Sequence, residues 1–204
     1  MQTIERENTG TLQGVSVKAS NLLDLLTGAA IAAHSKSDLK SLNGVYIKSE
    51  GGKLTAFATD RYRLIVGELA GEGKGELSNS FIPLTDIKRI ISTLKDLNKA
   101  DLGREVITLT RAGDLMTVIA CGSILTITIP GENCPPYEQL FTGEPAAISE
   151  IHLNADYLAA FNKVPGGGKE GQRFIFTGDR KPIKVNIPHD TIKWRGLLMP
   201  MRGA

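Results

Sequence analysis

Lysines at helical spacing are the residues of this sequence whose pattern most directly suggests chemistry. Lys88, Ser92, Lys95 and Lys99 fall at steps of four, three and four, and Arg89 lies beside them. Residues three or four apart share one face of an α-helix, so these cations form a stripe opposite a row of isoleucines. Such a stripe either contacts phosphates, which Lys and Arg bind without reading sequence, or is an ordinary solvated helix face.

No group of residues predicts a catalytic, cofactor or metal site. The run Gly166-Gly167-Gly168-Lys169 lacks the following Ser or Thr and the leading Gly of a phosphate-binding loop, which favours a flexible loop. The three histidines are scattered, and neither Cys121 nor Cys134 has a histidine at ligand spacing. We therefore expect a binding protein with no cofactor and no metal, and a hydrolase or nucleotide-binding enzyme is the least supported alternative.

The composition is that of an ordinary globular protein. The chain has 204 residues, of which 41% are hydrophobic and 23% charged, and this excludes a disordered or collagen-like chain. Lys and Arg number 24 against 22 Asp and Glu, so the net charge of +2 makes no case for nucleic acid unless basic residues gather locally. With no apolar leader or spanning segment and only two cysteines, we expect a reduced, cytoplasmic protein.

The elements that must position these residues begin with a strand, a helix and three strands. Apolar spacing predicts them at residues 15–19, 21–33, 45–47, 54–57 and 64–69. The Gly51-Gly52 pair predicts the hairpin turn between two of these strands. Residues 70–80, rich in glycine and charge, predict a linker or a long loop.

The same order then returns twice. A second unit is predicted at 81–82, 83–97, 106–109, 115–119 and 125–129, and a third at 151–153, 155–164, 174–176, 183–187 and 197–201. One helix and a few short strands cannot bury their own apolar face, so units must pair, with helices on one side of a sheet, in an α+β arrangement. An odd number of units leaves one without a partner inside the chain, which favours self-assembly.

Three strings of residues stand out within this order of elements. The first is Leu42-Asn43-Gly44-Val45, followed by Leu54 and Phe57-Ala58-Thr59-Asp60-Arg61-Tyr62-Arg63-Leu64. The others are Pro135-Pro136-Tyr137-Glu138-Gln139-Leu140 and Leu198-Met199-Pro200-Met201-Arg202. In this order and at these distances, the strings resemble the bacterial DNA polymerase III beta subunit, the sliding clamp, over roughly residues 15–202.

The resemblance implies a sliding-clamp (DNA clamp) fold of three strand–helix–strands units. Residues 12–141 resemble the middle domain of the clamp, with two units, and residues 146–204 resemble the closing unit of its last domain. In the family, twelve units close a ring whose helices line a hole around duplex DNA. Four chains of three units would supply twelve, so a homotetramer is favoured, although a dimer or trimer of other geometry stays open. The short form suggests a phage or other mobile-element clamp.

The resemblance also implies which cations face the DNA. In the family the helices face the phosphates, so contacts with double-stranded DNA are non-specific and weaken with salt. The expected DNA-facing residues are Lys36, Lys40, Lys88, Arg89, Lys95, Lys99, Lys163 and Lys169.

A second implied surface is a hydrophobic pocket in which the DNA polymerase and the clamp loader dock short peptide motifs. Its expected residues are Leu42, Thr59, Tyr62, Arg63, Leu64, Pro135, Leu140, Asn154, Tyr157, Leu197, Met199, Pro200, Met201 and Arg202. The alternative is that Leu64, Leu197 and Met199 are plain strand core. Arg61 and Tyr62 replace the Gly or His of the family, which leaves the partner preference open.

These features together predict a processivity factor: an accessory protein, not an enzyme, that encircles DNA and docks a polymerase. The alternative is a clamp-derived adaptor or transcription regulator that keeps the peptide pocket without sliding on DNA.

Overall fold

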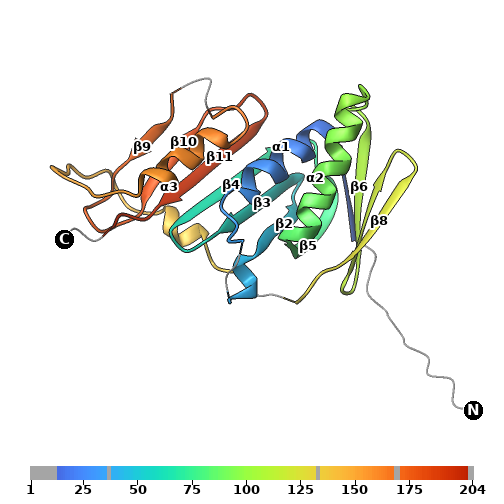
Figure 1. Cartoon of the computed structure of the whole chain (residues 1–204), viewed down its shortest axis with the longest axis horizontal. Helices are drawn as coiled ribbons and strands as arrows, with labels where there is room; N and C mark the ends of the chain where they lie inside the picture. Colours follow the sequence, from blue (N-terminus) through green and yellow to red (C-terminus); the bar gives the residue numbers. More distant parts are fainter. Residues whose placement is uncertain (1–12, 36–37, 132–133, 168–170, 202–204) are drawn as a thin grey trace, which may run out of the picture.

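The computed structural model describes residues 13–35, 38–131, 134–167 and 171–201, and their strands form one sheet with helices on one face (Figure 1). The eleven strands follow the order β8-β7-β6-β1-β5-β2-β3-β4-β11-β10-β9, and all neighbours run antiparallel. The predicted α+β arrangement is confirmed. Among the described residues, no helix is both long and apolar enough to cross a membrane.

The helices and strands form three successive units. The first unit holds β1 (Gln13–Lys18), α1 (Ala19–Ala30), the 3-10 helix η1 (Lys40–Leu42), β2 (Gly44–Glu50), β3 (Lys53–Thr59) and β4 (Arg63–Ala70). The second holds β5 (Lys74–Pro83), α2 (Leu84–Lys99), β6 (Val106–Ala112), β7 (Leu115–Ala120) and β8 (Ser123–Thr128). After the 3-10 helix η2 (Glu138–Phe141), the third holds α3 (Ala155–Ala160), η3 (Phe161–Lys163), β9 (Arg173–Ile175), β10 (Ile183–Ile187) and β11 (Ile192–Leu198).

The first two units exchange their leading strands. β1 lies between β5 and β6, and β5 lies between β1 and β2, so each leading strand pairs with the second strand of the other unit. α1 and α2 pack against each other over this exchange. Because both apolar faces close together, the two units share one core.

The expectation of a loop at residues 70–80 is wrong, because β5 begins at Lys74. The burial of β5 does not alternate along the strand, since its first three residues are exposed while Leu77 and Ser80 are buried. Gly75 has φ +115, and a Cβ there would lie 2.0 Å from the carbonyl oxygen of Gly14 on β1. Glycine therefore marks a close approach of two strands here and not a linker.

Two further expectations concern the third unit. Residues 151–153 form no strand, and the closing strand ends at Leu198, so Met199 and Met201 lie beyond it. The expected helix 155–164 is shorter, with α3 ending at Ala160 and continuing as η3. A leading strand needs a neighbouring strand to pair with, and sequence periodicity does not report whether one exists.

The third unit is joined to the first through the sheet and through one large side chain. β11 pairs with β4 over seven residue pairs, from Ile192 opposite Leu69 to Leu198 opposite Arg63. Trp194 of β11 is buried under α1, where Gly28 and Gly67 leave room for its ring. The sheet therefore continues from one unit into the next without a break.

Candidate functional site

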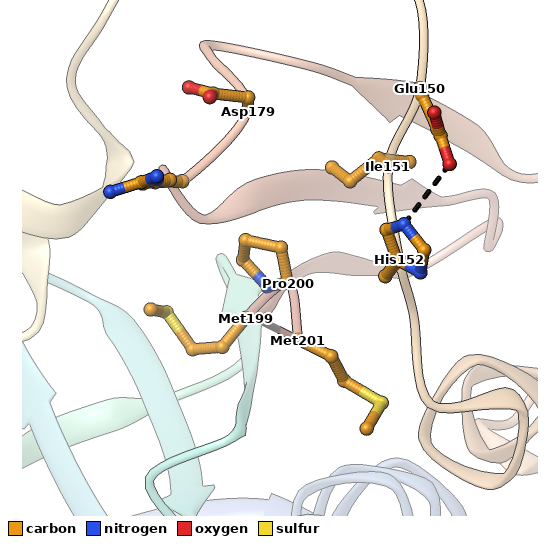
Figure 2. A pocket seen from close by; sticks show the side chains of 8 residues that line it. Glu150, Ile151, His152, Asp179, Met199, Pro200 and Met201 are labelled. Atoms are coloured by element: carbon orange, nitrogen blue, oxygen red, sulfur yellow. Dashed lines mark ion pairs between the residues drawn. The ribbon is translucent and has the colours of Figure 1, made fainter. Parts of the chain in front are cut away.

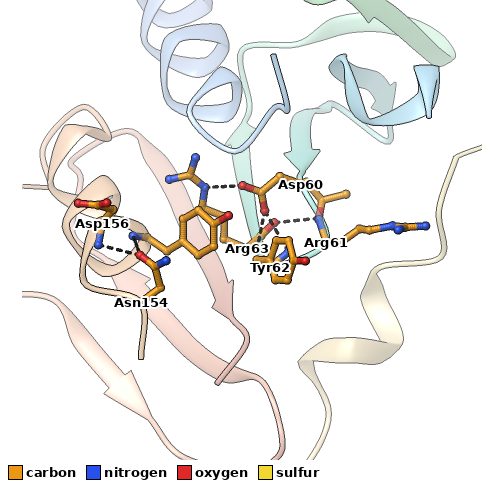
Figure 3. A network of polar contacts seen from close by, with 8 residues as sticks. Asp60, Arg61, Tyr62, Arg63, Asn154 and Asp156 are labelled. Carbon is orange, nitrogen blue, oxygen red and sulfur yellow. Dashed lines mark hydrogen bonds and ion pairs between the residues drawn. The ribbon is translucent and has the colours of Figure 1, made fainter. Parts of the chain in front are cut away.

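The turn between β3 and β4 is fixed by its own side chains (Figure 3). The Oδ1 atom of Asp60 accepts hydrogen bonds from the backbone N–H groups of Tyr62, at 3.0 Å, and Arg63, at 2.9 Å. Its Oδ2 atom accepts from Nε of Arg63 at 2.9 Å. Arg61 has φ +79, so this local network holds a residue in the left-handed region. The turn presents Tyr62 to solvent, with 55% of its surface exposed.

The third unit meets this turn at the start of α3. Oδ1 of Asn154 accepts hydrogen bonds from the N–H groups of Asp156 and Tyr157, at 2.9 and 3.1 Å, and so caps the helix. The rings of Tyr62 and Tyr157 stack with centroids 5.7 Å apart, and the Arg63 guanidinium lies 4.9 Å from the Tyr157 centroid. Partial removal from water, and next the charge of Asp60, raise the pKa of the Tyr157 phenol. Residues from two units thus form one aromatic, cationic surface.

The chain beyond β11 completes this junction. The N–H of Met199 donates to the carbonyl oxygen of Tyr62 at 2.8 Å, and the N–H of Met201 donates to that of His152 at 2.8 Å. Both methionine side chains remain exposed. The thioethers can therefore contact an incoming apolar group without moving the backbone.

A cavity of about 870 Å³ opens beside these methionines (Figure 2). Charged side chains line it beside the methionines, namely Asp179, Arg180 and the pair of Glu150 and His152, whose Oε1 and Nε2 atoms are 3.1 Å apart. The complete lining is Glu150, Ile151, His152, Asp179, Arg180, Met199, Pro200 and Met201. Four apolar and four charged or polar side chains share the lining, which suits a short peptide that carries both kinds of group.

The residues expected in the peptide pocket divide into three groups. The first lies at the junction and cavity: Thr59, Tyr62, Arg63, Asn154, Tyr157, Met199, Pro200 and Met201. The second is buried: Leu42, Leu64 and Leu197, the last two paired directly across β4 and β11. The third flanks Tyr137 in the linker: Pro135 is half-buried and Leu140 exposed. Arg202 lies outside the described residues.

An apolar cluster on the sheet face away from the helices explains the burial of Leu64 and Leu197. Leu64 and Leu197 belong to it, together with Tyr46, Phe57, Val66, Phe81 and Tyr137. Tyr137 packs on Phe57 with ring centroids 4.2 Å apart. Burial, and next the charge of Glu138, raise the pKa of the Tyr137 phenol. The linker thus covers this cluster, and the two leucines support the site from beneath.

Sequence analysis did not identify the cavity residues Glu150, Ile151, His152, Asp179 and Arg180. Glu150 to His152 precede the matched Asn154, so adjacency to the expected site was their one sequence signal. Asp179 and Arg180 lie in the turn between β9 and β10, and no spacing rule connects that turn with the end of the chain.

The cation stripe predicted on α2 takes the expected form. Lys88, Arg89, Lys95 and Lys99 are exposed, while Ile87, Ile90 and Leu94 are buried. Arg89 pairs with Asp86 at 2.8 Å, and Lys99 lies 3.7 Å from Asp96.

The remaining expected cations lie at helix ends or cannot be placed. Lys40 in η1 and Lys163 in η3 are exposed, whereas Lys36 and Lys169 fall outside the described residues. α1 carries no Lys or Arg and includes the half-exposed Asp24. The described positive charge of the helix layer is therefore centred on α2. Within the described part of the chain, no group of three His, Cys, Asp or Glu residues could hold a metal ion.

Comparison with known proteins gives consistent matches. Residues 16–118 match the family model described as DNA polymerase III beta subunit, central domain. The chain is 28% identical over 139 residues to a beta sliding clamp homolog, GriR, of Streptomyces muensis, covering 68% of this chain and 36% of that protein. It is 30% identical over 159 residues to the beta sliding clamp of Streptomyces coelicolor, covering 78% of this chain and 40% of that protein. The chain thus spans well under half the length of these relatives.

Solved structures show the same fold. A DNA polymerase sliding clamp from Pseudomonas aeruginosa with ligand superposes with a TM-score of 0.80 at 17% identity, covering 100% of this chain and 69% of the other. The DNA polymerase III beta subunit from Thermotoga maritima gives a TM-score of 0.76 at 16% identity, covering 94% and 66%. The arrangement of units is therefore that of the sliding-clamp fold.

Proposed function

The chain belongs to the DNA polymerase III beta subunit family, and on that premise we propose that it acts as a sliding clamp that holds a polymerase on DNA. The observation that carries the proposal is the placement of the two surfaces. The cations lie on α2 in the helix layer, and the cavity is lined by the third unit, beside the hydrogen bond of Met199 that joins it to the first unit. One molecule can therefore hold DNA on one surface and a protein partner on the other. In this role the protein is an accessory factor and not an enzyme.

The DNA surface in this proposal is non-specific. Exposed Lys and Arg side chains bind phosphates, and this binding neither reads bases nor resists salt. A protein that slides needs such weak, uniform contacts, because a closed ring keeps the DNA at high effective concentration. The proposal includes self-association into a ring, with four copies of this three-unit chain as the favoured number.

The decisive experiment is retention on circular DNA. We expect the protein, loaded onto nicked circular duplex, to stay bound through a high-salt wash and to leave when the circle is linearised. Protein that leaves the circle and the linear form equally under salt would contradict a topological hold on DNA.

The stripe on α2 can be tested separately by the salt dependence of binding. Replacing Lys88 and Lys95 with Gln should reduce the slope of log K against log salt by about 1.8, since each phosphate contact contributes about 0.9. Lys193→Gln is the matched control, because Lys193 is exposed on β11 next to the buried Trp194, whose side chain packs on the helix side. Equal slopes for the control and the double variant would show that α2 does not contact the DNA.

The cavity is proposed to take a short apolar peptide of a polymerase or loader. Tyr62 and Met199 are exposed at the junction, so they can be shortened with little loss of core. Because burying one large apolar side chain is worth about 1.5–3 kcal/mol, Tyr62→Ala with Met199→Ala should raise the peptide Kd at least about tenfold. Fluorescence polarisation with a labelled polymerase peptide measures this, and an unchanged Kd would sink the proposed pocket.

One observation favours a second function, that of a clamp-derived adaptor that does not slide. α1 carries no cation and includes Asp24, so part of the helix layer is not attractive to phosphates. An adaptor would bind the same peptide with the same affinity but would show no difference between circular and linear DNA.

A further inference from the structure

Within the described chain, the third unit has no partner of the kind that the first two units provide for each other. Within that pair, apolar residues of both leading strands are buried: Val15 and Val17 of β1 are 1% and 2% exposed, and Ile82 of β5 is 1% exposed. The third unit repeats the helix followed by three strands, but the described part of the chain contains no fourth unit beside it. A half domain of this kind exposes whatever its partner would cover.

The leading segment of the third unit is outside the sheet. β5, with ten residues, ends directly before α2, and the corresponding ten residues before α3 are 145–154. These residues form no strand, and none of them is buried. Its apolar members Ile148, Ile151 and Leu153 are half-exposed, where the paired units bury theirs.

The rest of the unpaired surface adjoins this segment. β9 lies at one end of the sheet and pairs with β10 alone (Figure 1). Phe174 of β9 and Phe176 just beyond it pack against the core but stay half-exposed. On α3, Leu158 is also half-exposed and Tyr157 packs on Tyr62 of the first unit, whereas α1 and α2 cover each other. The leading segment and one edge of β9 are thus unpaired in the described sheet, and the segment is tied to its own unit by the hydrogen bonds of the Ala146 N–H with the Phe176 carbonyl and of the Met201 N–H with the His152 carbonyl.

We propose that this surface binds the same surface of a second copy, so that two third units complete one two-unit domain across a two-fold axis. The proposal rests on the self-association in the proposed function and specifies the interface that carries it. Residues 145–154 of each copy lie beside β9 of the other, as β1 lies beside β6. The two α3 helices pack as α1 and α2 do. Such an isologous interface needs only one surface, which both copies possess.

The pairing inside the chain shows why β9 needs another third unit and not the free strand β8. β8 is the fourth strand of its unit, and the fourth strands β4 and β11 pair with each other between units. β2 and β6, which correspond to β9, pair instead with leading strands. A head-to-tail contact of β9 with β8 would match neither pattern.

The register of β1 and β5 locates the two-fold axis. Gly14 pairs with Glu76. Counted back from the first residue of each helix, these two positions correspond to Glu150 and Ala147 of the third unit. If Glu150 of one copy faces Ala147 of the other, the axis passes between Ile148 and Ser149. Ile148 of one copy then lies directly opposite Ser149 of the second.

Disulfide trapping tests this register. In a background with Cys121→Ser and Cys134→Ser, which removes both exposed free thiols, two differently tagged chains carry Ile148→Cys and Ser149→Cys. Residues directly opposite in antiparallel strands have Cβ atoms about 4.5–5.5 Å apart, within a small adjustment of disulfide geometry. We expect the mixed pair to cross-link on oxidation, and much faster than Ser149→Cys with Thr126→Cys on β8. Faster trapping to β8 would overturn the proposal in favour of a head-to-tail contact.

A proline substitution tests the pairing without relying on register. Ser149 is exposed and outside every strand of the single chain, so Ser149→Pro should leave the melting temperature of the monomer unchanged. Across the two-fold axis the same change removes a ladder donor, so the dimer Kd should rise about tenfold or more relative to Ser149→Ala. Equal Kd values in analytical ultracentrifugation would overturn the proposal. Loss of DNA retention with trapping intact would count against the sliding function alone, whereas retention without trapping would count against this interface alone.

Discussion

Asp60 holds the turn that presents Tyr62, and its substitution tests how much the junction depends on that turn. The carboxylate is 5% exposed and accepts from two backbone N–H groups and from Arg63. Breaking a buried charged pair costs about 3–5 kcal/mol, so Asp60→Ala should lower the Tm by about 6–20 °C in a chain of this size.

The matched control for this prediction is Asp86→Ala, which removes a more exposed Asp–Arg pair of the same i,i+3 spacing on α2. Surface pairs are worth about 0–1 kcal/mol, so its Tm should shift by only a few degrees. Calorimetry of both variants decides, and equal shifts would show that the Asp60 network does not stabilise the junction.

Asp24 on α1 gives a pH-dependent prediction. Burial raises its pKa above the usual 3.8, and the nearby His189 opposes that rise only in part. A carboxyl whose pKa is raised on folding contributes stability below its unfolded pKa and loses it as pH rises through the folded value. Asp24→Asn should therefore raise the Tm at neutral pH and have little effect below about pH 3.8. A Tm lowered at neutral pH would mean that the ion pair with His189 outweighs desolvation.

Individual residues also show what sequence could and could not predict at the site. Tyr62, Tyr157 and Met199 were expected together and do meet. Leu64 and Leu197 were expected in the same pocket, but each is under 5% exposed, in agreement with the alternative that they are strand core. A matched string specifies position along a strand and not which neighbours cover the side chain. For this reason Tyr62 and Met199 are better test positions than Leu64.

At the scale of elements, α1 packs closely on β11 because Gly28 of α1 leaves room for the ring of Trp194. A Cβ on Gly28 would lie 2.3 Å from the Trp194 ring. Glycine to alanine inside a helix ordinarily stabilises by about 0.5–1 kcal/mol, whereas overpacking a core costs about 1–3 kcal/mol. We predict that Gly28→Ala destabilises the protein, against the helix-propensity trend.

A double-mutant cycle identifies Trp194 as the cause. The atoms nearest to the added Cβ belong to the six-membered ring of the indole, so Trp194→Phe should make room for it. The free energy of unfolding lost through Gly28→Ala should then be smaller in the Trp194→Phe background than in the unmodified protein. If the two substitutions lower the free energy of unfolding additively in chemical denaturation, Trp194 is not the cause of the strain.

Elements with strong periods were predictable, and elements defined by their neighbours were not. α2 has three buried apolar residues at helical spacing and exposed lysines opposite, so its pattern was sufficient. β5 begins with Lys74, Gly75 and Glu76, and only its pairing with β1 makes this segment a strand. Residues 151–153 show the reverse case: they alternate like a strand but pair with no strand of the described chain. Both errors arise because pairing is tertiary information.

At the scale of the whole molecule, the sheet has two free ends of different kinds. β9 ends it at the third unit and β8 at the second. β8 presents Ile124, which is 71% exposed and pairs with Ile119, itself 40% exposed. An edge strand with exposed apolar residues invites another strand. If β9 is paired with a second copy across the two-fold axis, β8 remains as the free edge through which such dimers can close a ring.

This division of roles predicts that the two ends can be separated by mutation. Ile124→Glu places a charge on the edge at β8, so it should prevent ring closure while leaving the two-fold dimer intact. Mass photometry should then show dimers where the unmodified chain forms the larger assembly, and retention on circular DNA should be lost. Val106→Glu serves as a control for added charge, since Val106 is 60% exposed on β6, which is paired on both sides. If Ile124→Glu gives monomers instead, association begins at β8 and not at β9, the other free strand edge of the described sheet.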